Sequence, residues 1–155
     1  MANVNYNALI DVDSSQVWQT LKAFGDISQW HPAIVQSSIS DDKSDGVPGC
    51  IRTLSLTDGT VLLEKLLSMD DHNLQFSYCF EESPLPVDNY IATIKVIPIS
   101  GKKQAAILWS ATFDLRQPDP EGTHASIIYS LIVSGHQSLQ VFLQQKKNSD
   151  ANVHY

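Results

Sequence analysis

The sequence predicts an α+β fold in which a curved antiparallel sheet wraps around one long C-terminal helix. Two observations support this prediction. The middle of the chain contains successive alternations of apolar and polar residues separated by tight turns, which is typical of antiparallel hairpins. The last part of the chain instead spaces its apolar residues three and four apart, as an amphipathic helix does. A bent sheet that wraps such a helix is expected to enclose an internal hydrophobic cavity.

The chain is expected to begin with a strand and two short helices. Residues 3–12 alternate as a strand, and Asp13 then offers a side-chain cap to a first short helix. Gly25 is expected to end this helix. A second brief helical turn begins near Asp26 and ends before Pro32, because the residue that precedes a proline is disfavoured in the helical conformation.

Tight turns at Asp58-Gly59 and Ser100-Gly101 divide the next part of the chain into antiparallel hairpins. The segment at residues 34–40 and a loop rich in Asp, Ser, Gly and Pro precede these hairpins. The strands are expected at residues 50–56, 60–69, 73–80, 90–100 and 104–115.

The C-terminal helix is expected from Thr123 to about Lys147. Its apolar positions recur at steps of three and four and are Ala125, Ile128, Ile132, Gly135, Leu139 and Phe142. The β-branched residues in its first turns also suit a strand, which leaves that alternative open there.

A chain of 155 residues is long enough for one hydrophobic core. We therefore expect a single domain over residues 1–147 and a disordered tail over residues 148–155.

The charge balance excludes several classes of partner. The chain has 10 Lys and Arg against 17 Asp and Glu, a net charge of −7, so nucleic acid and anionic membranes are not expected to bind it. No apolar run reaches the roughly 20 residues of a membrane-spanning helix, and the first residues do not resemble a signal peptide. A cytoplasmic monomer or homodimer is expected.

Cys50 and Cys79 lack metal-ligand spacing, which indicates reduced thiols and no metal site.

Strand alternation places three polar side chains on the covered face of the sheet. Residues two apart in a strand share a face, and an intervening polar residue marks the solvent side. Thr53 marks that side next to Arg52, and Lys65 marks it next to Glu64. Tyr90 falls on the inner face of its strand by the same argument. These three groups are therefore expected to converge inside an otherwise apolar enclosure.

Further residues are expected to line this enclosure and to contact a ligand. They are Trp30, Leu54, Leu62, Phe76, Tyr78, Ala92, Trp109 and Leu139. The loop Pro84-Leu85-Pro86 is both apolar and turn-forming, and we expect it to act as a mobile lip at the mouth of the cavity.

Two interpretations of the inward polar residues remain open at this point. A buried Arg and a buried Glu each cost several kcal/mol in lost hydration unless they are paired or bind something. Arg52 and Glu64 can therefore form a structural ion pair, with Tyr90 donating a hydrogen bond. The same groups can instead form a site that holds a ligand.

Five runs of residues, in chain order, resemble one known superfamily. They are Pro48-Gly49-Cys50-Ile51-Arg52, Glu64-Lys65-Leu66, Leu74-Gln75-Phe76-Ser77-Tyr78, Asp88-Asn89-Tyr90-Ile91-Ala92-Thr93 and Trp109-Ser110. These runs resemble the START/Bet v 1-like superfamily, also called SRPBCC, whose members have the helix-grip fold. Within it, the polyketide cyclase/dehydrase-like group that contains the plant lachrymatory factor synthases is the most similar. Abscisic acid receptors are more distant, and the sequences of their gate and latch loops are replaced here.

The resemblance implies a function for the three inward polar residues. In lachrymatory factor synthases the matching Arg, Glu and Tyr are the catalytic groups, and they correspond to Arg52, Glu64 and Tyr90. It implies a cofactor-free enzyme that isomerises, dehydrates or cyclises a small hydrophobic molecule with one polar oxygen by proton transfer. The alternative is a carrier that binds a small hydrophobic ligand without chemistry, because one fold serves both roles.

Overall fold

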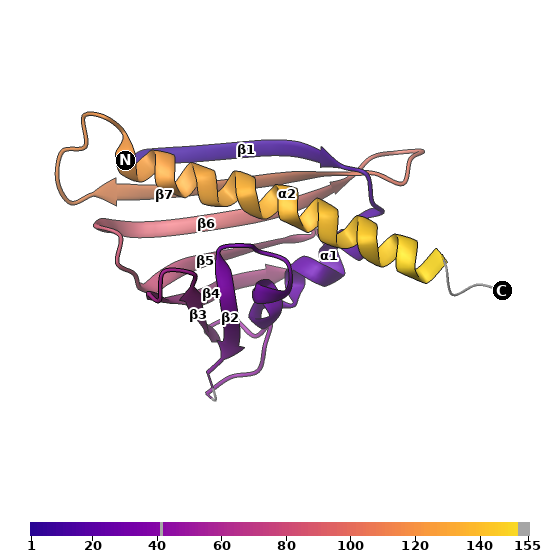
Figure 1. Cartoon of the computed structure of the whole chain (residues 1–155), viewed down its shortest axis with the longest axis horizontal. Helices are drawn as coiled ribbons and strands as arrows, with labels where there is room; N and C mark the ends of the chain where they lie inside the picture. The colour runs from indigo at the N-terminus through magenta and orange to yellow at the C-terminus, as the bar shows by residue number, and fades with distance from the viewer. Residues whose placement is uncertain (41, 152–155) are drawn as a thin grey trace.

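Seven strands form one antiparallel sheet in the computed structural model, which describes residues 1–40 and 42–151 (Figure 1). The order of strands across the sheet is β1-β7-β6-β5-β4-β3-β2. The strands are β1 (Ala2–Ile10), β2 (Ile34–Ile39), β3 (Ile51–Leu56), β4 (Val61–Asp70), β5 (Gln75–Glu82), β6 (Val87–Pro98) and β7 (Ala105–Leu115). The helices are α1 (Ser14–Lys22), the 3₁₀ helix η1 (Phe24–Gln29) and α2 (Thr123–Ala151).

The long helix α2 crosses one face of the curved sheet, and α1 lies beside the C-terminal half of α2 (Figure 1). This arrangement confirms the predicted α+β helix-grip architecture. The side chains that point toward α2 form one core in which the alternate residues of β6, from Tyr90 to Val96, are buried as predicted. Within the described ranges, no helix is long and apolar enough to cross a bilayer.

Local sequence signals explain where several elements begin and turn. Asp13 caps α1, since its Oδ2 atom accepts a hydrogen bond of 3.2 Å from the Ser15 amide. Gly59 and Gly101 have φ angles of +87° and +76°, which favour glycine in the predicted hairpin turns. Both cysteines are free thiols, Cys50 buried and Cys79 half-buried.

The structure corrects two expected helix boundaries. Gly25 does not end α1, which ends at Lys22, but lies inside η1. Its lack of a side chain is needed there because a Cβ atom would lie 3.1 Å from Asp45 Oδ2 and would also collide with Ile39. The helix α2 continues past Lys147 to Ala151, so residues 148–151 are helical rather than a disordered tail. Residues 152–155 of the expected tail lie outside the described residues.

The helix α2 approaches its neighbours closely at Gly135. A Cβ atom at this position would lie 2.9 Å from His31 Nε2 and 3.1 Å from Trp109 Cη2. Two aromatic rings therefore pack against the bare backbone of the helix. The position was predicted to face the core, but the periodicity does not show that glycine is required there.

We expect Gly135→Ala to lower the free energy of unfolding by about 1–2 kcal/mol, as overpacked core sites do. The loss occurs although alanine favours the helical state by about 1 kcal/mol over glycine. Urea denaturation measures the effect, and Ser130→Ala, at an exposed position of α2, is the control. A Gly135→Ala protein as stable as the parent would contradict the close approach of His31 and Trp109.

Candidate ligand cavity

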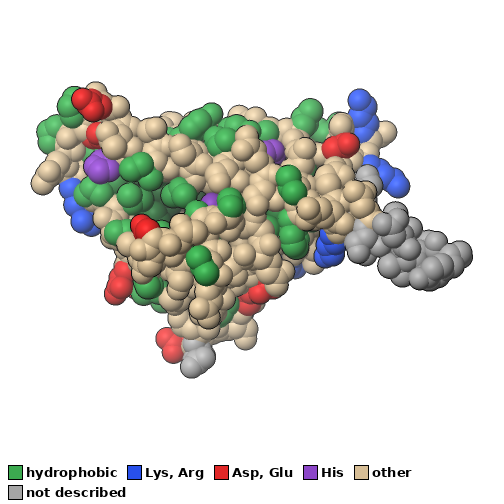
Figure 2. Space-filling model, viewed as in Figure 1, with side chains coloured by type: hydrophobic (Ala, Val, Ile, Leu, Met, Phe, Trp, Pro, Cys, Tyr) green, Lys and Arg blue, Asp and Glu red, His purple; other side chains and the backbone are tan. Residues whose placement is uncertain are grey.

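A cavity of about 450 Å³ lies between the sheet and the N-terminal half of α2. Figure 2 shows hydrophobic side chains gathered around a hollow below the first turns of α2. Ile128 and Ile132 of α2 form one wall of the cavity, and Leu54 and Leu62 of the sheet form another. Pro84 and Leu85 lie on its border, which is the place expected for the lip, although mobility of this loop stays a prediction.

The polar end of the cavity is built on the pairing of β3 with β4, which sets Arg52 directly opposite Glu64. Arg52 Nε donates to Glu64 Oε1 at 2.8 Å, and Arg52 Nη2 lies 2.6 Å from the same oxygen. Both side chains are buried. Glu64 Oε2 has no hydrogen-bond partner among the residues that the structure describes. One carboxylate oxygen is thus held, and the other is available.

Arg52 is held from three further directions. Its Nη1 donates to the carbonyl oxygen of Phe24 at 2.9 Å. The guanidinium carbon lies 3.8 Å from the centre of the Phe24 ring and 4.8 Å from that of the Tyr78 ring. Guanidinium groups are attracted to aromatic faces, most strongly where water is excluded. The cation is therefore fixed between two rings, a carbonyl and a carboxylate.

Burial sets the protonation of the groups around this pair. Burial raises the pKa of the Glu64 carboxyl, and the charge and hydrogen bond of Arg52 oppose this shift. Burial also raises the pKa of both Tyr78 and Tyr90, so their phenols stay neutral hydrogen-bond donors. The Tyr90 ring stacks on Phe80 with a centroid distance of 3.9 Å, which fixes its orientation.

His31 connects the cavity wall to α2. Its Nε2 atom lies 3.0 Å from the carbonyl oxygen of Leu131, and its Nδ1 accepts from the Ala33 amide at 3.2 Å. Both contacts suit the neutral ring protonated at Nε2. Burial, together with the nearby Arg52 charge, lowers the pKa of His31 to about 4, although the hydrogen bond to Leu131 opposes the shift.

Most of the predicted site residues meet in this cavity. Arg52, Glu64 and Tyr90 line it together with Leu54, Leu62, Tyr78 and Trp109. The roles predicted for these side chains stay predictions. The indole nitrogen of Trp109 is buried and has no hydrogen-bond partner among the described residues, which leaves a donor on the cavity wall.

Four predicted ligand contacts lie elsewhere. Phe76, Ala92 and Leu139 are buried in the core and do not line the cavity. Strand alternation and helical periodicity identify the inner face correctly. They do not show which part of that face is covered by other side chains and which part borders the cavity. Trp30 lines a separate groove on the other side of η1.

Sequence reasoning missed other residues of the cavity wall. Ile127 and Leu131 of α2 line it beside Ile128 and Ile132, because the cavity is wider than the predicted apolar stripe. His31 also lines the cavity and was not among the predicted ligand contacts. No local pattern showed its bond to α2, since the two partners are far apart in the chain.

Residues 1–128 match the family model described as polyketide cyclase / dehydrase and lipid transport. The chain belongs to this family. No curated protein matches the chain. Membership in this family supports a ligand-binding or cyclase-type role.

Solved structures of similar proteins support the family and the fold. A protein from Bacillus thuringiensis has 26% identity and a TM-score of 0.81, with 92% of this chain and 99% of that chain covered. The protein XoxI from Bacillus cereus has 26% identity and a TM-score of 0.83, with 94% and 99% covered. Norcoclaurine synthase from Thalictrum, solved with a transition-state analogue, shares the fold at 19% identity and a TM-score of 0.68, with 94% and 96% covered.

Removing one member of the buried ion pair should be more damaging than removing both. We expect Arg52→Met to lower the free energy of unfolding by about 3–5 kcal/mol, because Glu64 is left without a partner. The double variant Arg52→Met/Glu64→Met should recover most of this loss, since no unpaired charge remains. Urea denaturation at pH 7 measures both proteins. A double variant as unstable as the single one would show that the pair stabilises the fold directly.

His31 should make the protein less stable in acid. Its pKa is about 4 in the folded protein and 6.5 when unperturbed, so between these values only the unfolded chain binds the proton. Stability from this group is complete above pH 6.5 and decreases by roughly 3 kcal/mol as the pH falls to 4. His31→Gln retains a donor for Leu131 but does not titrate. The difference in unfolding free energy between the two proteins should change over this pH range, and a constant difference would contradict the assignment.

Proposed function

We propose that this protein is a cofactor-independent enzyme that moves a proton within a small hydrophobic molecule carrying one polar oxygen. The reaction class is isomerisation, dehydration or cyclisation. The observation that carries the proposal is the asymmetric use of the Glu64 carboxylate. Arg52 contacts only Oε1, which leaves Oε2 available beside a largely apolar cavity.

Glu64 is the proposed base, and then the proposed acid. Burial raises the pKa of its carboxyl, which makes it a stronger base than an exposed glutamate and allows it to return the proton. In the proposed step Oε2 takes a proton from carbon, and the electron pair of that bond moves toward the polar oxygen of the substrate. The protonated carboxyl then delivers the proton to another atom of the same molecule.

The polar oxygen of the substrate gains negative charge in this step and needs donors. Tyr90 is the proposed main donor, because its phenol stays neutral and its ring is fixed on Phe80. The Arg52 guanidinium adds positive charge within the same enclosure. The match of Arg52, Glu64 and Tyr90 to the catalytic groups of the lachrymatory factor synthases supports these roles but does not identify the substrate.

A carrier of small hydrophobic molecules is the alternative function. The observation that favours it is that Glu64 and the carbonyl oxygen of Phe24 already accept hydrogen bonds from Arg52. The buried cation is therefore satisfied without any ligand. The family description includes lipid transport beside cyclase and dehydrase activity. In a carrier the same polar groups orient the ligand and no bond changes.

Glu64→Gln separates the two functions. Glutamine has the size of glutamate and can accept from Arg52, but it cannot take a proton. With a panel of small carbonyl, sulfenic acid and enol compounds, we expect turnover to fall at least about 100-fold while binding changes only severalfold. The rate of the parent protein should decrease as the pH is lowered through the raised pKa of Glu64.

The control is Glu82→Gln, which changes an exposed carboxylate at the end of β5 and should leave turnover unchanged. If the panel binds but neither the parent nor Glu64→Gln converts any compound, the carrier function is supported. Equal turnover by the parent and Glu64→Gln would exclude Glu64 as the base.

A further inference from the structure

A second hollow, of about 370 Å³, lies between α1, η1 and the C-terminal half of α2. We name it the helix groove. It shares no lining residue with the larger cavity. Its volume is within the range of small-molecule sites. The helix groove is therefore a separate candidate for a ligand.

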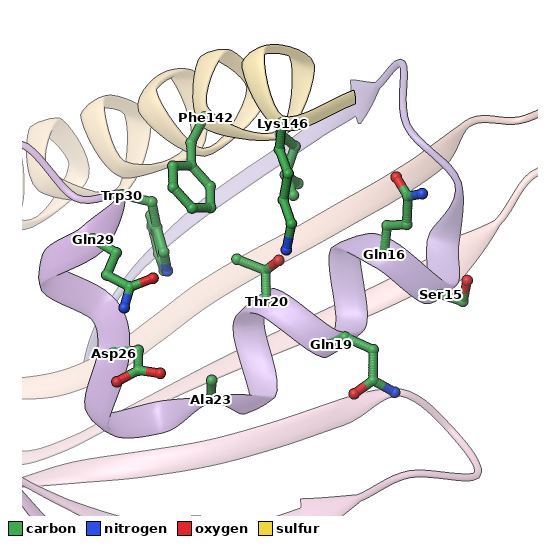
Figure 3. A pocket seen from close by; sticks show the side chains of 11 residues that line it. Ser15, Gln16, Gln19, Thr20, Ala23, Asp26, Gln29, Trp30, Phe142 and Lys146 are labelled. Atoms are coloured by element: carbon green, nitrogen blue, oxygen red, sulfur yellow. The ribbon is translucent and has the colours of Figure 1, made fainter. Parts of the chain in front are cut away.

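The two ends of the helix groove have different chemistry (Figure 3). Lys146 extends from α2 toward Thr20 of α1 at one end, whereas Trp30 and Asp26 lie at the other. Phe142 projects from α2 into the space between them. A molecule in the groove would thus meet polar groups at both ends and an apolar surface in the middle.

The Trp30 end of the groove has an unused hydrogen-bond donor. The Trp30 side chain is only 5% exposed, and its indole nitrogen has no hydrogen-bond partner among the described residues. Leaving a buried donor without a partner is unfavourable, because it has lost its hydrogen bonds to water. An acceptor atom brought by a ligand, with a small adjustment of the groove wall, would satisfy it.

The charges of Asp26 and Lys146 limit which ligand fits. Neither side chain forms an ion pair with another residue that the structure describes. The Lys146 ammonium and the Thr20 hydroxyl suit a carboxylate. The opposite end, which Gln29 also lines, favours a group that accepts from Trp30 and donates to Asp26. A hydroxyl does both, whereas an ammonium group only donates, a carbonyl only accepts and a second carboxylate is repelled by Asp26.

We propose that the helix groove binds a short hydroxycarboxylate. Its carboxylate lies at Lys146 and Thr20, its apolar chain lies against Phe142 and Ala23, and its hydroxyl lies between Trp30 and Asp26. The proposal is independent of the chemistry proposed for the larger cavity. If the proposal for one site fails, the proposal for the other site is unaffected.

The test uses 6-hydroxyhexanoate as the probe, with NMR of the indole N–H signals of the full-length protein. We expect a saturable shift of the Trp30 signal that exceeds the shift of Trp109. Hexanoate, which lacks the hydroxyl, should bind about tenfold more weakly. Hexan-1-ol, which lacks the carboxylate, should bind about threefold more weakly, as expected from the loss of an exposed ion pair.

Two exposed substitutions check the orientation of the ligand. Lys146→Met should weaken 6-hydroxyhexanoate about threefold and leave hexan-1-ol unchanged. Asp26→Ala should reduce the preference for 6-hydroxyhexanoate over hexanoate. Lys103→Met, at an exposed position outside the groove, is the control and should change nothing.

Three results would each overturn the proposal. One is equal affinity for 6-hydroxyhexanoate and hexanoate, and another is unchanged affinity in Lys146→Met. The third is a Trp109 shift larger than that of Trp30, which would place the probe in the larger cavity.

Discussion

The buried ion pair between Arg52 and Glu64 is the interaction on which the arrangement of the site depends. Two charges removed from water require partners, and the fold provides them for the guanidinium and for one carboxylate oxygen from separate parts of the chain. The pairing of β3 with β4 places the carboxylate beside the guanidinium, and Phe24 of η1 provides a carbonyl and a ring. The pair therefore joins the sheet to the short helices and fixes the polar end of the cavity.

The two halves of α2 border different hollows of the molecule. In the C-terminal half Leu139 and Leu143 are fully buried, and Leu143 lines the helix groove beside α1. In the N-terminal half Ile128 and Ile132 are equally buried from solvent, but they face a hollow of about 450 Å³. The close approach at Gly135 lies between these halves, where His31 and Trp109 contact the helix backbone.

The sequence was sufficient to predict the architecture and the inner face of each central strand, because period-two alternation reports directly which side is covered. Arg52, Glu64 and Tyr90 were placed in one enclosure on this basis, and the structure brings all three to the cavity. The pattern does not show which part of a covered face borders the cavity. Phe76 and Leu139 were therefore predicted to line the cavity, although they lie in the packed core. Contacts between distant segments, such as that of His31 with Leu131, leave no local signal.

The short turn between β3 and β4 controls more than the path of the chain. Arg52 and Glu64 face each other only because the Asp58-Gly59 turn sets the register of the two strands. In a β-strand, a shift of one position moves each side chain to the opposite face of the sheet. A change in this turn that shifted the register by one position would direct either Arg52 or Glu64 to the solvent, together with its apolar neighbours. The register of this hairpin is therefore as strict a requirement for the site as the identity of the charged residues.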